Sequence, residues 1–100
     1  MEKTKYLKPV EVKDYTVNDS FWKPKMEIVR TQMIPYQWKA LNDAIEGAAP
    51  SHCIKNFRIA AGLEDGEFEG CLWQDSDLAK WLEAVGYTLI WKKDEELEKT

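Results

Sequence analysis

Two aspartates that stand close together are the residues in this sequence whose types most directly suggest chemistry. Asp75 and Asp77 lie one residue apart, directly before an apolar-periodic run that continues to Trp91. A pair of carboxylates can supply the acid and the base of glycoside hydrolysis, which requires a raised pKa for the acid. Free backbone N–H groups and the dipole at a helix start favour the ionised carboxylate instead. We therefore favour helix capping by Asp75, Ser76 and Asp77, which still leaves the aspartates able to hydrogen-bond a ligand.

Trp73 is the tryptophan whose position best suits contact with a ligand. The other four of the five tryptophans lie within or at the end of predicted helices. Three of these (Trp22, Trp38 and Trp81) fall on apolar stripes, where packing in the core is the expected role. Trp73 precedes a helix start and is followed by Gln74 and Asp75. Trp73, Gln74 and Asp75 are therefore the predicted substrate-binding residues.

Other residues that could hold a metal or act as nucleophiles are isolated in the sequence. His52 and Cys53 are neighbours, but there is no C-x-x-C motif and no second histidine to complete a zinc site. Four acids between Leu63 and Gly70 lack the D-x-D-x-D-G order of a calcium loop. No G-x-S-x-G or phosphate-binding glycine loop is present. We expect structural thiols at Cys53 and Cys71, and neither a catalytic residue nor a metal or cofactor site in this chain.

Composition favours one small globular domain. The chain has 100 residues, of which 44% are hydrophobic, and a formal net charge of -4. No basic cluster suggests nucleic-acid binding, and no apolar run is long enough to span a membrane. Because the N-terminal residues lack the apolar centre of a signal peptide, we expect a cytoplasmic protein.

Hydrophobic periodicity predicts a mainly helical chain. A first helix carries Trp22, Met26, Val29 and Met33 on one stripe, and Pro35 is expected to break or kink it. A second helix carries Trp38, Leu41 and Ile45 and is expected to stop at Gly47. A short helix should be capped by Asn56 and ended by Gly62. The longest helix should present Leu78, Trp81, Leu82, Val85, Leu89 and Ile90, with Gly86 packed closely against a neighbour.

Three segments, taken together, resemble the N-terminal region of one enzyme family. They read "DSFWKPKMEIVRTQMIPYQW", "NFRIAAGLEDGEFEG" and "WQDSDLAKWLEAVGYTL". Their order and spacing are similar to those of glycoside hydrolase family 127, the β-L-arabinofuranosidase-like enzymes. The resemblance extends from about Val10 to Trp91, and its specificity lies in the combination of F-W-x-P, I-P-Y-Q, N-F-x-x-A-A-G and D-S-D-x-x-K-W-L-E-A.

The resemblance implies a longer enzyme than these 100 residues. Its catalytic domain would be an (α/α)6 barrel of paired helices, followed by β-sandwich domains. It would remove terminal β-L-arabinofuranosyl units with retention of configuration, through a cysteine nucleophile held at a zinc ion by further cysteines and a glutamate. That cluster lies far downstream of the matched region in the family, so Cys53 and Cys71 are not expected to belong to it.

We therefore expect the first helices of an (α/α)6 barrel, preceded by a short extended arm or strand. Residues 1–100 would be the N-terminal part of the catalytic domain, with residues 1–19 as the arm and 20–100 as a helical set truncated at its C-terminal end. Such a chain would be inactive alone, would contact an arabinofuranosyl glycan in the longer enzyme, and would self-associate through exposed apolar helix faces. The alternatives are a related glycosidase of different specificity and a freestanding helical module that binds sugar or protein.

Overall fold

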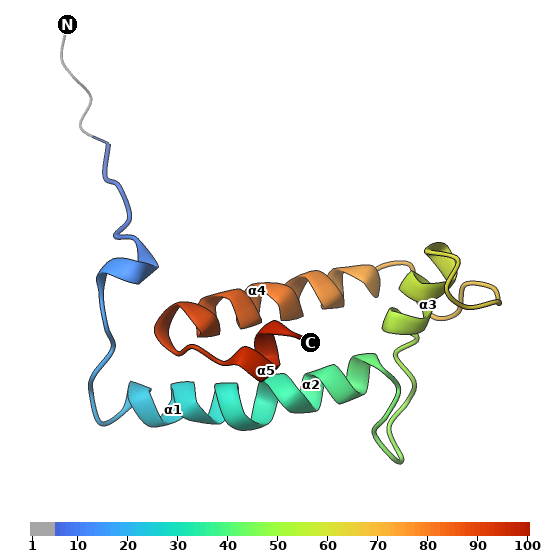
Figure 1. Cartoon of the computed structure of the whole chain (residues 1–100), viewed down its shortest axis with the longest axis horizontal. Coiled ribbons are helices and arrows are strands. Elements are labelled where there is room, and N and C mark those ends of the chain that lie inside the picture. The colour runs from blue at the N-terminus through green and yellow to red at the C-terminus, as the bar shows by residue number, and fades with distance from the viewer. Residues whose placement is uncertain (1–5) are drawn as a thin grey trace, which may run out of the picture.

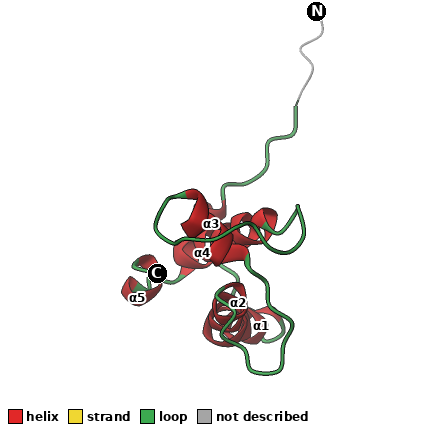
Figure 2. Cartoon of the chain, turned by 90° about the vertical axis from the view of Figure 1, so that its right-hand side faces the viewer, coloured by secondary structure: helices red, strands yellow, loops and turns green. Residues whose placement is uncertain are grey.

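The computed structural model describes residues 6–100, and the elements in this range are helical. Two long helical rods run antiparallel, and a shorter helix and its loops join them at one end (Figure 1). In chain order the elements are η1 (Val12–Asp14), α1 (Trp22–Ile28), η2 (Val29–Met33), α2 (Ile34–Leu41), α3 (Cys53–Ala60), α4 (Asp75–Trp91) and α5 (Glu95–Glu98). The predicted mainly α class is confirmed, and Figure 2 shows no strand in the described part of the chain.

The N-terminal arm has no strand between residues 6 and 19. It forms a single 3-10 turn, η1, and otherwise irregular backbone up to α1. The first five residues of the predicted arm lie outside the described residues. Asp19 then starts α1, because its carboxylate accepts the backbone N–H groups of Phe21 and Trp22 at 2.9 and 2.6 Å.

The sequence predicts that Pro35 breaks or kinks the first helix; there is no break, but the winding changes to a π-helix just before Pro35. α1, η2 and α2 form one continuous rod from Trp22 to Leu41 (Figure 1). Proline lacks an N–H group, and its ring crowds the carbonyl four residues earlier in an α-helix. Here η2 is a π-helical segment, and the N–H group of Ile34 donates to the carbonyl of Val29, five residues back. This wider winding accommodates Pro35 within the rod.

α2 ends at Leu41, six residues before the predicted stop at Gly47. Asp43 adopts a positive φ of 58°. The N–H of Ala44 donates to Lys39 and that of Asp43 to Ala40, which is the hydrogen-bond pattern of a Schellman motif. The prediction was wrong because an aspartate took the left-handed position that glycine usually occupies.

α3 begins at Cys53, three residues before the predicted cap at Asn56. His52, with a φ of 59°, precedes the helix, and Asn56 lies within it with its side chain turned toward a later loop. At the other end, Gly62 has a φ of 70°, and Leu63 N–H donates to Arg58. The predicted stop at Gly62 is confirmed, whereas the predicted cap at Asn56 is wrong.

The core lies where α2 crosses α4 and where α3 joins them. It consists of five buried apolar residues: Ile34, Leu41, Cys53, Trp81 and Val85. The Trp81 indole is 7% exposed, lies 4.6 Å from the Trp38 ring, and donates its N–H to the Ile34 carbonyl at 3.0 Å. The predicted core roles of Trp38 and Trp81 are therefore confirmed.

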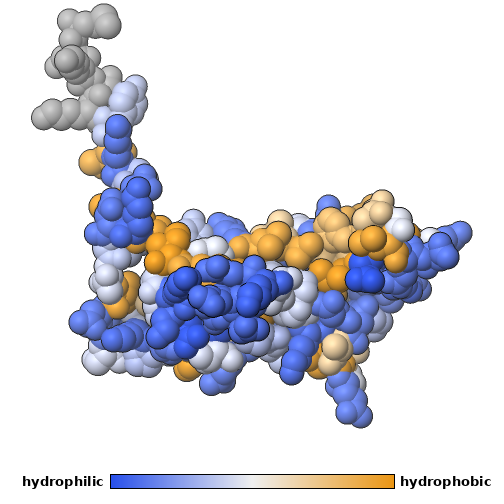
Figure 3. All heavy atoms as spheres, viewed as in Figure 1, coloured by the Kyte–Doolittle hydropathy of each residue, from blue (hydrophilic) through white to orange (hydrophobic). Residues whose placement is uncertain are grey.

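Part of the predicted apolar face of α4 is uncovered in this chain. Leu82 and Ile90 are about half exposed, and nothing lies within 4 Å of a side chain built on Gly86. Figure 3 shows hydrophobic surface along the upper edge of the molecule, where Figure 1 places α4. The predicted close neighbour of Gly86 is absent from residues 6–100. The predicted core role of Trp22 is wrong, because this side chain is 58% exposed. No helix in this range combines the length and apolarity needed to cross a membrane.

The α2–α4 contact can be tested by shortening Trp81. Trp81→Phe removes the N–H donor to Ile34 and part of the buried ring, so we expect the free energy of unfolding to fall by about 1–3 kcal/mol. Urea unfolding followed by circular dichroism measures the change. Trp73→Phe is the control, because Trp73 is 71% exposed and its change should stay within about 0.5 kcal/mol. Equal losses in both variants would contradict this description of the core.

Candidate functional site

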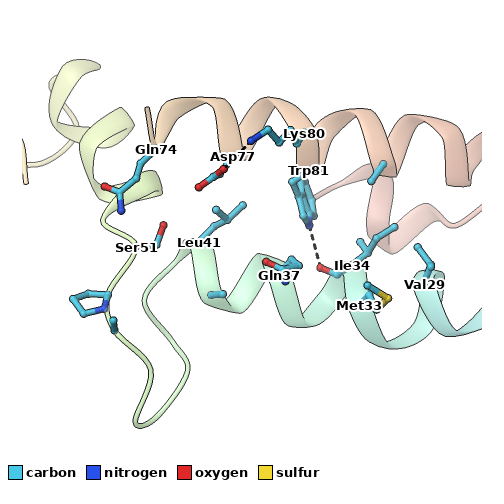
Figure 4. A pocket seen from close by; sticks show the side chains of 14 residues that line it. Val29, Met33, Ile34, Gln37, Leu41, Ser51, Gln74, Asp77, Lys80 and Trp81 are labelled. Atoms are coloured by element: carbon cyan, nitrogen blue, oxygen red, sulfur yellow. Dashed lines mark hydrogen bonds and ion pairs between the residues drawn. The ribbon is translucent and has the colours of Figure 1, made fainter. Parts of the chain in front are cut away.

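A cavity of about 580 Å³ opens between α2 and α4, next to the buried core. Its inner wall is apolar, with Ile34, Leu41 and Trp81 among the lining residues. Polar side chains lie along the rest of the wall and come from both helices and from the two connecting segments (Figure 4): Gln37, Ser51, Gln74, Asp77 and Lys80. An apolar cavity with a few convergent polar groups is the usual form of a small-molecule site.

The three predicted substrate-binding residues point in different directions. Gln74 lines the α2–α4 cavity. Asp75 lines a smaller cavity of about 170 Å³, beside Cys53 and Phe57. Trp73 lines neither of these cavities and is 71% exposed. Of these three residues, the structure therefore brings Gln74 alone to the α2–α4 cavity, and the binding roles of all three stay predictions.

Gln74 is held in place by hydrogen bonds to both its side chain and its backbone carbonyl. Its side-chain Oε1 accepts the backbone N–H of Cys71 at 2.9 Å, and its backbone carbonyl accepts the Cys53 thiol at 3.0 Å. Gly70, with a φ of 92°, leaves the room that the Gln74 carboxamide occupies. Gln74 Nε2 makes no hydrogen bond to other side chains or backbone in residues 6–100, so it can donate to a molecule in the cavity.

The predicted capping of α4 by aspartates is confirmed only in part. The residue at the cap position is Gln74, whose side chain makes no cap hydrogen bond. Asp75 accepts one first-turn N–H, that of Ser76, at 2.9 Å, whereas Asp77 pairs with Lys80 at 3.3 Å. Both aspartates do lie in the first turn, where the helix dipole favours negative charge.

The two aspartates do not form a pair that faces one site. Asp77 lines the α2–α4 cavity, whereas Asp75 lines the smaller cavity on the α3 side. A carboxylate pair that hydrolyses a glycoside must flank a single scissile bond. The arrangement of Asp75 and Asp77 therefore gives no support to general acid and base catalysis by these two residues.

The metal-ligating residue types are dispersed in the described part of the chain. Residues 6–100 contain no group of three or more histidine, cysteine, aspartate or glutamate side chains that could hold a metal ion. Cys53 is buried and Cys71 is exposed, and the thiol of Cys53 donates to a backbone carbonyl. A zinc site of the kind that the family resemblance implies requires several cysteines around one ion, and the residues present here do not fit one.

Sequence reasoning assigned no site role to three of the polar residues around the α2–α4 cavity. Gln37 and Lys80 belong to the family motifs I-P-Y-Q and D-S-D-x-x-K-W-L-E-A and Ser51 belongs to none of them, whereas Asp77 was considered only together with Asp75. Gln37 follows Pro35 by two residues, in a stretch where the prediction expected a helix break. Because the helical spacing across Pro35 could not be assigned, nothing in the sequence indicated that Gln37 and Gln74 border the same cavity.

The comparison with protein families identifies the chain. Residues 14–100 match the model described as the β-L-arabinofuranosidase GH127 catalytic domain. The chain belongs to glycoside hydrolase family 127.

Known GH127 proteins support this assignment at the levels of sequence and fold. The chain is 38% identical over 95 residues to a non-reducing end β-L-arabinofuranosidase of Bifidobacterium longum subsp. longum, covering 83% of the chain and 14% of that relative. The crystal structure of a GH127 β-L-arabinofuranosidase from Geobacillus stearothermophilus T6 matches with a TM-score of 0.82 and 62% identity. That match covers 84% of the chain and 13% of the solved structure, so the chain spans about one seventh of the length of either relative.

The two cysteines of this GH127 chain should differ sharply in their reactivity toward alkylating reagents, because Cys53 is buried and Cys71 is exposed. Burial raises the pKa of the Cys53 thiol above its ordinary value, which lowers the thiolate fraction at any given pH. We expect iodoacetamide at pH 8 to label Cys71 and to leave Cys53 unlabelled in the folded chain, as peptide mass spectrometry would show. In denaturing urea both should react. Rapid labelling of Cys53 without urea would contradict the buried position.

Proposed function

We propose that this chain is the N-terminal part of the catalytic domain of a β-L-arabinofuranosidase. In the proposed longer enzyme, the helices would form part of the (α/α)6 barrel wall, and the α2–α4 cavity would contact the sugar. The observation that carries the proposal is the likeness to the Geobacillus enzyme, at 62% identity over 84% of the chain. Identity at this level over most of the chain supports a shared substrate class.

The cavity itself is suited to a sugar ring. Trp81 and Leu41 give it an apolar inner wall, and carboxamides come from Gln37 on α2 and from Gln74, the residue that precedes α4 (Figure 4). Sugars present hydroxyl groups that both donate and accept hydrogen bonds, and a carboxamide can do both. Trp73 would lie outside this cavity, just before the start of α4. Its exposed aromatic ring would be available to a neighbouring sugar unit.

The chemistry would be supplied by residues outside this chain. Retention of configuration, the cysteine nucleophile and the zinc ion are inferred from the family resemblance, and the donor set of residues 6–100 does not fit a zinc site. The part proposed for these residues is therefore to bind and orient the arabinofuranosyl unit. The 100-residue chain alone should not hydrolyse it.

Release of arabinose tests this proposal directly. We expect no release from a p-nitrophenyl β-L-arabinofuranoside by residues 1–100, with or without zinc. A longer protein that continues from these residues through the whole barrel should release L-arabinose. Hydrolysis of another aryl glycoside in place of the arabinofuranoside would favour a related glycosidase of different specificity. Activity of the 100-residue chain alone would contradict the proposed division of roles.

Substitution of the cavity carboxamides tests the sugar contact in the longer protein. Gln37→Ala and Gln74→Ala each remove one set of hydrogen-bonding groups, so we expect KM for the aryl arabinofuranoside to rise about 2- to 10-fold. Gln32→Ala is the matched control, because Gln32 is exposed on the same rod and lies outside the cavity. Its KM should stay within about twofold of the parent value. Unchanged KM in both cavity variants would contradict the sugar contact.

A further inference from the structure

The loop between α3 and α4 is fixed to α3 at one residue, Glu69. Asn56 Nδ2 donates to the Glu69 carbonyl at 2.8 Å, and the Glu69 N–H donates to Asn56 Oδ1 at 3.1 Å. One side chain therefore binds both backbone groups of a residue that is 13 positions away in the sequence. A pair of reciprocal hydrogen bonds restricts both the position and the rotation of the peptide that it holds.

The side chain of Glu69 is also directed toward α3. Its carboxylate lies 2.7 Å from Lys55 Nζ and 3.8 Å from His52 Nδ1. The hydrogen bond and the charge of Lys55 lower the pKa of Glu69 below its ordinary value. Because Glu69 is half exposed, these ionic contacts are weak, and the Asn56 hydrogen bonds carry the geometric constraint.

The residues that follow Glu69 connect this fixed point to Gln74. Gly70 turns the chain with a φ of 92°, and the next N–H, that of Cys71, donates to Gln74 Oε1 at 2.9 Å. The position of the Cys71 N–H depends on the orientation of the Glu69 backbone, two residues earlier in the chain. The carboxamide of Gln74 is thereby oriented with its oxygen toward the loop and its Nε2 free for the α2–α4 cavity.

We propose that Asn56 is a positioning residue that orients the Gln74 carboxamide at the α2–α4 cavity, acting through Glu69 and the backbone of Gly70 and Cys71. The claim that Gln74 contacts a sugar rests on the proposed function. The claim that Asn56 orients Gln74 concerns only contacts within this chain. Asn56 contacts Glu69 and is not among the residues that line the α2–α4 cavity, so a change at Asn56 would act on a sugar in that cavity indirectly.

Amide hydrogen exchange of the 100-residue chain tests the orienting role without a substrate. Asn56→Ala removes both hydrogen bonds to Glu69, so exchange of the Cys71 N–H, measured by NMR, should accelerate about 5- to 30-fold. Glu64→Gln is the matched control, because it removes the 3.3 Å pair of Glu64 with Arg58 between the same helix and the same loop. Its effect on Cys71 should stay within about twofold. Equal exchange of Cys71 in Asn56→Ala and in the parent chain would overturn the proposal.

Gly70→Ala tests the last step of this route, the contact between Gln74 and the Cys71 N–H. It remains informative if Asn56→Ala unfolds the chain. A methyl group at this position would collide with the Gln74 carboxamide. We expect faster exchange at Cys71 and unchanged exchange at Glu69, whose N–H is still held by Asn56. Unchanged exchange at Cys71 in Gly70→Ala would also overturn the proposal, because Gln74 would then not be the acceptor.

Kinetics of the longer protein test whether the orientation of Gln74 reaches the sugar. Asn56→Ala should raise KM for the aryl arabinofuranoside about as much as Gln74→Ala, and the double variant should be no worse than Gln74→Ala alone. Additive losses would overturn action through Gln74. Absence of arabinofuranosidase activity in the parent protein would instead refute the proposed function, and the exchange measurements would still decide the role of Asn56.

Discussion

The hydrogen bond from the Trp81 indole to the Ile34 carbonyl is the interaction on which the arrangement of the two rods depends. It joins the middle of α4 to the first residue of α2, in a region where both residues are almost fully buried. Trp38 packs against the same indole and closes one side of the contact. Because the donor is a large rigid ring, the contact fixes both the separation of the rods and their register, and it forms the wall of the adjacent cavity.

The π-helical segment before Pro35 makes this contact compatible with a continuous rod. An α-helix broken at Pro35 would separate Val29 from Ile34 and Leu41, which here belong to one packed surface. The connecting segments are fixed by polar side chains rather than by burial. Asp43 accepts the N–H groups of Ser51 and His52, and Asn56 holds Glu69. These hydrogen bonds constrain the exposed segments that precede and follow α3.

The small core agrees with a chain that is one portion of a GH127 catalytic domain. Five apolar residues are buried in the described range, while Leu82 and Ile90 on α4 are about half exposed. In an (α/α)6 barrel each helix packs against neighbours on more than one side, which would use such a face. Self-association of the isolated chain through this surface stays a prediction. Gly86 lies on this helix too, and no residue of the described range packs against it as the sequence predicted.

The sequence by itself determined the helical class, the apolar stripes around Trp38 and Trp81, the stop at Gly62 and the family, because these depend on local periodicity and on motifs. It did not determine how Pro35 is accommodated, where α2 ends, or which residues share a cavity. Asn56 could be judged only as a cap, since the partner that uses its amide is 13 residues away. Asp75 and Asp77 are two positions apart in the sequence but line different cavities, because each helical position turns by about 100° and two positions therefore point to nearly opposite sides of α4. Only the tertiary structure decided these points, since they depend on contacts between distant segments and on the space that those segments leave.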